Sequence, residues 1–192
     1  MAEEPTERTY AAELVKALST VGGSLGFDAE VEWKTPSGYP DVKIYYKGKV
    51  VAIIEVKKPE VPLSDPKLNE QALRYAEWYR VNYNVMFYGI HNMRYLKLFK
   101  YVTKREIKPQ LTILDFIREP AGNWVPVSDF PFKIMPWATS IRDYKQITTY
   151  KGARENLKKF LLSFKEVLEG KILDLSKEVI DTIRKLIEEG AS

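Results

Sequence analysis

Hydrophobic and polar positions in the first third of the chain follow the pattern of one helix and three strands. Residues 5–21 place apolar side chains at three- and four-residue steps, which predicts an amphipathic helix. The glycine-rich stretch 21–26 that follows is expected to end this helix. Residues 30–34 alternate between polar and apolar, which predicts a half-buried strand. Residues 41–56 form two β-branched runs around a short Lys-Gly-Lys turn, which predicts a β-hairpin.

The next part of the chain shows a strand–helix–strand pattern. Asp65 and Pro66 suit the N-cap and first position of a helix that extends to about residue 81. Residues 84–90 are apolar throughout, as in a strand buried on both faces, and residues 95–102 alternate as in a further strand. A helix between two strands of one sheet implies a parallel crossover. The predicted fold class is therefore α/β.

The C-terminal half gives a weaker pattern. Five prolines interrupt residues 103–150, and the aromatic side chains there are expected to cover an edge of the core rather than to stack on bases. Residues 153–169 and 175–189 carry apolar stripes at helical spacing, and Gly170 stands between them as a terminator. These stripes predict a C-terminal helical hairpin.

Three units follow from these patterns. They are a core at 1–105, a connecting segment rich in proline and aromatic residues at 106–152 that packs on the core, and an amphipathic helical hairpin at 153–192.

Composition excludes several kinds of chemistry. The chain of 192 residues has no cysteine, which rules out disulfides, cysteine–zinc sites, iron–sulfur clusters and thiol catalysis. No apolar run approaches the length of a membrane span, and the charged N-terminus lacks the apolar segment of a signal peptide, so we expect a cytoplasmic protein without a membrane partner. The net charge of +4 suits a polyanionic partner. The cysteine-free, charge-rich composition is also compatible with a thermophile.

Three charged groups interrupt the hydrophobic pattern of the predicted hairpin: Asp41, Glu55 and Lys57. Side chains alternate along a strand, so Glu55 and Lys57 share one face. A two-residue loop in a regular hairpin would set Asp41 opposite Ile54, on the wrong face. A three-residue loop at 47–49 would set Asp41 opposite Glu55. If the three groups act together, the hairpin must have an odd-length loop or a bulge.

Two directly opposed carboxylates repel each other unless a cation lies between them. Oxygen ligands with open positions suit Mg²⁺, which takes its remaining ligands from water and phosphate. A lysine beside such a site can position an attacking water and neutralise charge at phosphorus. This chemistry is that of phosphodiester hydrolysis. The alternative is a solvent-exposed charged end of a hairpin with one ordinary cross-strand ion pair.

The order Pro40-Asp41, hairpin, Glu55-Val56-Lys57 resembles the PD-(D/E)xK nuclease superfamily. The spacing of Gln71 and Tyr75 is similar to the QxxxY motif of some of its branches. Segments 52–59, 62–65 and 71–76 together most resemble the nuclease domain at the start of type I restriction enzyme motor subunits and related restriction–methylation proteins. The resemblance covers roughly residues 5–100. It implies a restriction-endonuclease-like core of order αβββαβ, with a mixed sheet flanked by helices.

The resemblance also implies a metal site. Asp41, Glu55 and the backbone carbonyl of Val56 would hold Mg²⁺, with Mn²⁺ as a substitute. An acidic residue of the first helix would help; Glu7 matches this position best, and Glu13 is the alternative.

Further catalytic roles come from the same resemblance. Lys57 would position the attacking water. Gln71 would orient the site, and Tyr75 would support it.

The predicted function is a Mg²⁺-dependent DNA endonuclease of restriction-enzyme type. A Holliday-junction resolvase-like nuclease and a non-catalytic nucleic-acid-binding module with the same fold are the alternatives. The chain has no P-loop motor motif and no amino-methyltransferase motif. The expected partners are therefore DNA, motor, methylase or specificity subunits or domains absent from this chain, and a second copy in a homodimer.

Overall fold

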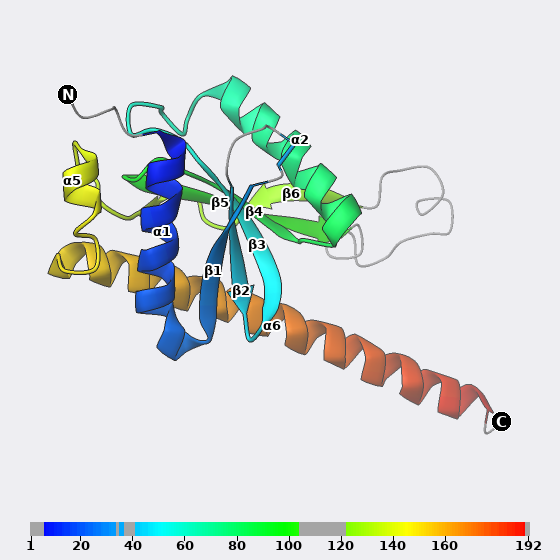
Figure 1. The fold of residues 1–192 in the computed structure, drawn as a ribbon. Coiled ribbons are helices and arrows are strands. Elements are labelled where there is room, and N and C mark those ends of the chain that lie inside the picture. The colour runs from blue at the N-terminus through cyan, green and yellow to red at the C-terminus, as the bar shows by residue number, and fades with distance from the viewer. Residues whose placement is uncertain (1–5, 34, 37–40, 104–121, 191–192) are drawn as a thin grey trace.

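The computed structural model describes residues 6–33, 35–36, 41–103 and 122–190; side chains of residues 171–179 are not included (Figure 1). The elements in chain order are α1 (Glu7–Gly22), η1 (Gly23–Leu25), β1 (Phe27–Glu32), β2 (Asp41–Tyr46), β3 (Lys49–Val56), α2 (Pro66–Tyr83), β4 (Phe87–His91), β5 (Tyr95–Thr103), β6 (Gly122–Pro126), β7 (Phe132–Lys133), α5 (Ile141–Tyr144) and α6 (Lys151–Gly190).

A mixed seven-stranded sheet forms the centre of the protein. Its strands lie in the order β1-β2-β3-β4-β5-β6, and β7 pairs with β5. Strands β3 and β4 are parallel and are joined through α2, whereas the other paired strands are antiparallel. The element order up to β4 is αβββαβ. The predicted α/β fold with a mixed sheet flanked by helices is therefore confirmed.

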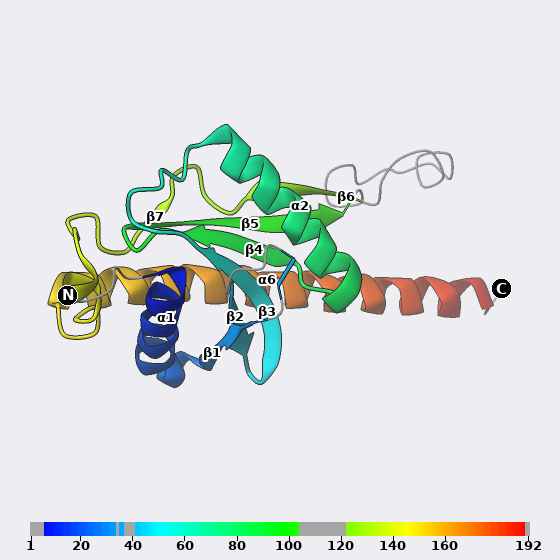
Figure 2. The same ribbon diagram turned by 45° about the horizontal axis from the view of Figure 1, so that its top comes forward.

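Helices cover the two faces of the sheet unequally. Helices α1 and α6 lie on one face and α2 lies on the other (Figures 1 and 2). The larger hydrophobic core lies under α1 and α6, where Phe164 of α6 stacks on Phe27 at 5.7 Å and packs edge-on against Phe87 at 5.0 Å between ring centroids. A smaller core under α2 joins Leu68, Ala72 and Tyr79 to strand residues. Each face is thus closed by its own apolar layer.

The β2–β3 hairpin has a two-residue loop, so the expected three-residue loop is wrong. Tyr46 pairs with Lys49, and the loop residues Lys47 and Gly48 both have positive φ, as tight hairpin turns require. The bulge was the other expected solution, and it is present. The register shifts between Ile44 and Tyr45 because β3 has one residue more than β2 at this point.

The predicted C-terminal helical hairpin is wrong. Helix α6 runs without a break from Lys151 to Gly190 and passes through Gly170. A glycine inside a helix costs only about 1 kcal/mol relative to alanine, which is too little to end a long helix. Apolar residues of its first half, among them Leu157, Phe160 and Phe164, are buried against the sheet. Residues 180–190 are exposed and extend past the sheet (Figure 2).

The sheet also extends beyond the predicted core at 1–105. Strand β6 pairs with β5 from Phe99↔Pro126 to Thr103↔Gly122, and β7 pairs with the start of β5. The described part of the predicted connecting segment therefore supplies strands to the core itself; residues 106–121 lie outside the described residues. Among the described helices, none has a stretch long and apolar enough for a transmembrane segment.

Candidate active site

Asp41 and Glu55 lie directly opposite each other on β2 and β3. The bulge makes this pairing possible, because it shifts the alternation of β2 relative to β3 by one residue. Both carboxylates point to the α2 face of the sheet, and each side chain is only 1% exposed. Directly opposed residues have Cβ atoms about 4.5–5.5 Å apart. The fold therefore places two acids side by side in a nearly water-free site.

Two tyrosine hydroxyls contact this pair. Tyr79 of α2 donates a hydrogen bond to Asp41 Oδ2 at 3.0 Å, and Tyr88 of β4 donates to Glu55 Oε2 at 3.4 Å. Burial raises the pKa of both phenols further above its usual value, and the neighbouring acids add to the shift. Both hydroxyls thus stay protonated and act as donors. The sequence analysis did not identify either tyrosine as part of the site.

Lys57 lies beside the pair, as strand alternation predicted. Its ammonium is 3.2 Å from Glu55 Oε1. The Lys57 amide donates to the carbonyl of His91 at 2.7 Å, which continues the β3–β4 pairing one residue beyond the strand. The side chain is 17% exposed. A rigid backbone thus carries the lysine, whose charge lies between the buried carboxylates and solvent.

The charges of the two carboxylates are only partly compensated by neighbouring groups. Burial raises the pKa of Asp41 well above its usual range, and the charge of Glu55 raises it further; Tyr79 and Lys57 act in the opposite direction. Asp41 Oδ1 and Glu55 Oε1 are buried without a hydrogen bond from any described residue, although Glu55 Oε1 has the Lys57 ammonium nearby. Two directly opposed, buried carboxylates are a donor set that suits a hard divalent cation. The residues present therefore fit Mg²⁺.

A third carboxylate, Glu32, pairs with Asp41 from the neighbouring strand β1. Its charge also raises the pKa of Asp41. However, the Lys43 ammonium holds Glu32 at 2.6 Å, so this acid already has a cationic partner.

The residues predicted on the first helix lie on the other side of the sheet. Glu7 is in the first turn of α1, and the neighbouring Arg8 guanidinium lies 4.5 Å from the Trp33 ring centroid, just after β1. This places the start of α1 at the Asp41 end of the sheet. Glu13 faces Tyr144, whose pKa its charge helps to raise. Within the described ranges, no three acidic or histidine side chains are grouped to hold a metal. A metal-binding role for Glu7 stays a prediction.

Gln71 and Tyr75 interact with each other rather than with the carboxylates. Gln71 Nε2 donates to the Tyr75 hydroxyl at 2.7 Å, one helical turn further along α2. Their predicted roles, to orient and support the site, stay predictions. The same holds for the Val56 carbonyl as a metal ligand, while Pro40 of the motif lies outside the described residues.

Comparison with solved structures shows similarity to the type IIG restriction endonuclease BpuSI, with a TM-score of 0.50 and 14% sequence identity. The alignment covers 89% of this chain and 18% of that chain, so this protein spans less than a fifth of that enzyme. At this level of identity the similarity concerns the fold. No match was found among curated proteins.

The family comparison agrees with the motifs. Residues 2–108, more than half of the chain, match the family described as type I restriction enzyme R protein N terminus. This range includes Asp41, Glu55, Lys57 and α2. The similarity of fold to a restriction endonuclease and the match over these residues agree, and the chain belongs to the type I restriction enzyme R protein N-terminal (HSDR_N) family.

Proposed function

We propose that this protein is a metal-dependent DNA endonuclease of restriction-enzyme type that hydrolyses phosphodiester bonds. The observation that carries the proposal is the buried, directly opposed pair Asp41 and Glu55, in which Asp41 Oδ1 has no hydrogen bond from a described residue and Glu55 Oε1 lies 3.2 Å from the Lys57 ammonium. Membership of a restriction enzyme family supports it. The net charge of +4 supports DNA as the partner.

A structural role alone explains this pair poorly. Two buried like charges lose hydration and repel each other, and one lysine cannot compensate both. A divalent cation held by Asp41 and Glu55 would remove the repulsion between the two carboxylates. When bound, Mg²⁺ would supply Lewis-acid activation of a phosphate oxygen and of water. The carboxylates would hold it, and Tyr79 and Tyr88 would keep them in place.

Lys57 has a separate role in this proposal. Its ammonium is anchored by Glu55 and the side chain is 17% exposed, so the lysine can contact a phosphate that approaches from solvent. There it would position the attacking water and stabilise charge that develops on the phosphate oxygens. Motor, methylase and specificity subunits or domains, or a second copy of the chain, would provide what one site of this size lacks: translocation, recognition and a second cut.

The test is cleavage of supercoiled plasmid, linear duplex, single strands and a four-way junction, each with Mg²⁺ or Mn²⁺. We expect wild type to cut, Asp41→Ala to lose all cutting, and Lys57→Ala to lose about 10²–10⁴-fold. Lys58→Ala is the matched control, because it removes the next lysine of the chain, which has no role in the proposed site. Circular dichroism confirms that each variant is folded.

The substrate profile separates the alternatives. A strong preference for the junction would replace the restriction-enzyme proposal with a resolvase. If folded wild type cuts no substrate and Mg²⁺ does not raise its melting temperature, the chain is a binding module and the endonuclease proposal is wrong.

A further inference from the structure

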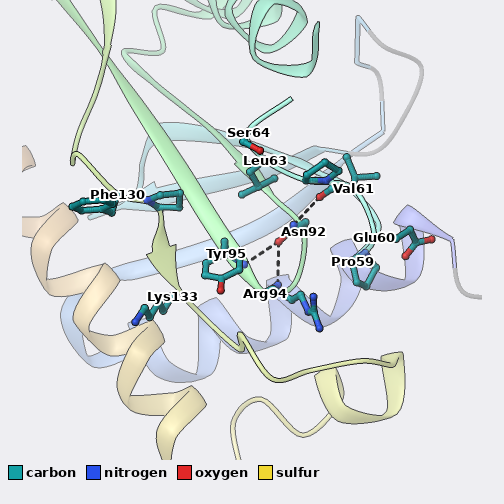
Figure 3. Close-up of a pocket in the computed structure, with 12 residues that line it drawn as sticks. Pro59, Glu60, Val61, Leu63, Ser64, Asn92, Arg94, Tyr95, Phe130 and Lys133 are labelled. Carbon is teal, nitrogen blue, oxygen red and sulfur yellow. Dashed lines mark hydrogen bonds between the residues drawn. The ribbon is translucent and has the colours of Figure 1, made fainter. Parts of the chain in front are cut away.

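A pocket of about 780 Å³ opens next to the candidate active site. Its wall begins at Pro59, two residues after Lys57, and includes the loop to Ser64 and the start of β5 (Figure 3). Two residues span at most about 7 Å of extended chain, so the pocket begins within one nucleotide's reach of the catalytic lysine. It lies beyond the carboxyl ends of the parallel strands β3 and β4, where α/β sheets commonly bind ligands.

The lining of the pocket combines aromatic and cationic side chains. Tyr95 and Phe130 provide aromatic surface, and Arg94 and Lys133 provide positive charge. Figure 3 shows Phe130 and Lys133 on one side of Tyr95 and Glu60 on the opposite side of the pocket. Glu60 is the single acid of the lining, so the Lys133 side of the pocket is the side that favours a phosphate.

The base of the pocket is rigid. The Asn92 side chain accepts hydrogen bonds from the amides of Arg94 and Tyr95 at 3.2 and 2.9 Å, and it donates to the Val61 carbonyl at 2.8 Å (Figure 3). These bonds tie the loop after β3 to the β4–β5 turn. Arg94 Nε donates to the Ala138 carbonyl at 2.8 Å, which fixes the guanidinium at the pocket. The shape of the pocket therefore exists before any ligand binds.

Phe130 is unusual for an aromatic side chain in a loop. It is 81% exposed, more than any other large hydrophobic side chain in the described part of the chain. The Ser128 hydroxyl donates to the Phe130 carbonyl, which holds the loop that presents the ring. An exposed aromatic beside cationic groups is the arrangement on which unpaired bases stack.

We propose that this pocket takes one unpaired nucleotide of the DNA strand next to the scissile phosphate. The base stacks on Phe130 and Tyr95, and its phosphate contacts Lys133. This inference rests on the proposed nuclease function and adds a substrate class to it. DNA with an overhang, gap or flap beside the cut is preferred over blunt duplex, because a paired base must first be unstacked at a cost of a few kcal/mol.

The experiment measures binding of the full chain to a fluorescein-labelled duplex with a single-stranded overhang and to the blunt duplex of the same sequence. Ca²⁺ replaces Mg²⁺ so that no cutting occurs. We expect wild type to bind the overhang more tightly, Phe130→Ala to weaken overhang binding about tenfold, and Phe130→Trp to restore it. Lys133→Gln weakens binding and reduces its salt dependence. Leu162→Ala and Lys158→Gln, exposed on α6, are matched controls that leave binding unchanged.

Two results with wild type overturn the inference: no binding to the overhang, or no preference for the overhang over the blunt duplex. Two results with Phe130→Ala also overturn it: unchanged binding to the overhang, or an equal loss of binding to both DNAs. Cleavage in Mg²⁺ by the same proteins keeps the two proposals apart. If Phe130 governs overhang binding but wild type does not cut, the nuclease proposal fails and the pocket stands. If Asp41→Ala abolishes cutting while Phe130→Ala binds and cuts as wild type does, the pocket proposal fails alone.

Discussion

The two faces of the sheet bury their polar groups in opposite ways. Under α1 and α6 the core is almost entirely apolar, and its buried His91 is paired with the Tyr144 hydroxyl through Nε2. Burial lowers the pKa of His91 to about 3, so this side chain is neutral and needs no counter-charge. Under α2, Asp41 and Glu55 are buried in direct opposition, and Asp41 Oδ1 has no hydrogen bond from a described residue. The first face thus buries a neutral polar group, whereas the second face buries two directly opposed acids.

This difference separates stability from function. Side chains of the α1/α6 face stabilise the fold without contacting the candidate site, whereas the buried acids of the α2 face would lower stability and serve the proposed function. Four substitutions test this comparison, beginning with the largest expected effect.

Phe164→Ala should lower the free energy of unfolding by about 3–5 kcal/mol, because it removes a fully buried ring that contacts Phe27 and Phe87. Urea denaturation measures the loss. Leu162→Ala, two residues away and 40% exposed, is the control and should change stability by no more than about 0.5 kcal/mol. Cleavage per folded molecule should be unchanged. If cleavage falls together with stability, the α1/α6 face also affects activity and the comparison is wrong.

His91 should make stability fall in mild acid. Its folded pKa of about 3 lies below the unfolded value of 6.5, so the unfolded chain gains a proton first as pH decreases. The contribution is complete above pH 6.5 and should decline by about 2 kcal/mol between pH 7 and pH 5. In His91→Gln this part of the pH dependence should vanish, whereas Tyr144→Phe should keep it. Urea midpoints at several pH values provide the measurement, and equal slopes for wild type and His91→Gln would contradict the prediction.

Asp41→Asn should stabilise the metal-free protein at neutral pH by about 1–2 kcal/mol, because it removes one of two opposed buried charges. The same change should abolish the rise in melting temperature that Mg²⁺ produces in wild type. Differential scanning fluorimetry with EDTA and with Mg²⁺ measures both. Asp181→Asn, whose acid is exposed on α6, controls for loss of a negative charge. If the metal-free Asp41→Asn protein is less stable than wild type, neighbouring groups already compensate the charge of Asp41 without a metal, and the prediction is wrong.

Tyr79→Phe should weaken Mg²⁺ binding about tenfold, because it removes the hydroxyl that holds Asp41 Oδ2 at 3.0 Å. Tyr88→Phe is the matched comparison, because it removes the hydroxyl that donates to Glu55. That hydrogen bond is longer, at 3.4 Å, so Tyr88→Phe should weaken Mg²⁺ binding less than Tyr79→Phe does. Titration calorimetry with Mg²⁺ measures the two affinities. The reverse order would mean that Glu55, rather than Asp41, is the ligand that the tyrosines position.

Helices and strands were predictable from the sequence where the spacing of nearby apolar residues determines the secondary structure. The pattern of apolar positions predicted α1, α2 and strands β1 to β5 to within a few residues, and Asp65-Pro66 marked the start of α2, whereas β6 and β7 were not predicted. The hairpin turn and α6 were less predictable. The expected loop of three residues and the helix break at Gly170 both relied on glycine, which permits a turn or a break without requiring one.

The sequence by itself determined that the chain forms an α/β sheet and that Glu55 and Lys57 share one face, because strand alternation is a local property of the backbone. Tertiary structure alone decided that Asp41 joins them. One bulge in a regular two-residue hairpin changed the face of every position beyond it. The two tyrosine donors and the pocket beside Pro59 also depend on tertiary structure. Their residues come from α2, β4 and the β6–β7 segment, which meet at one end of the sheet. Contacts between segments so far apart arise from packing the whole chain.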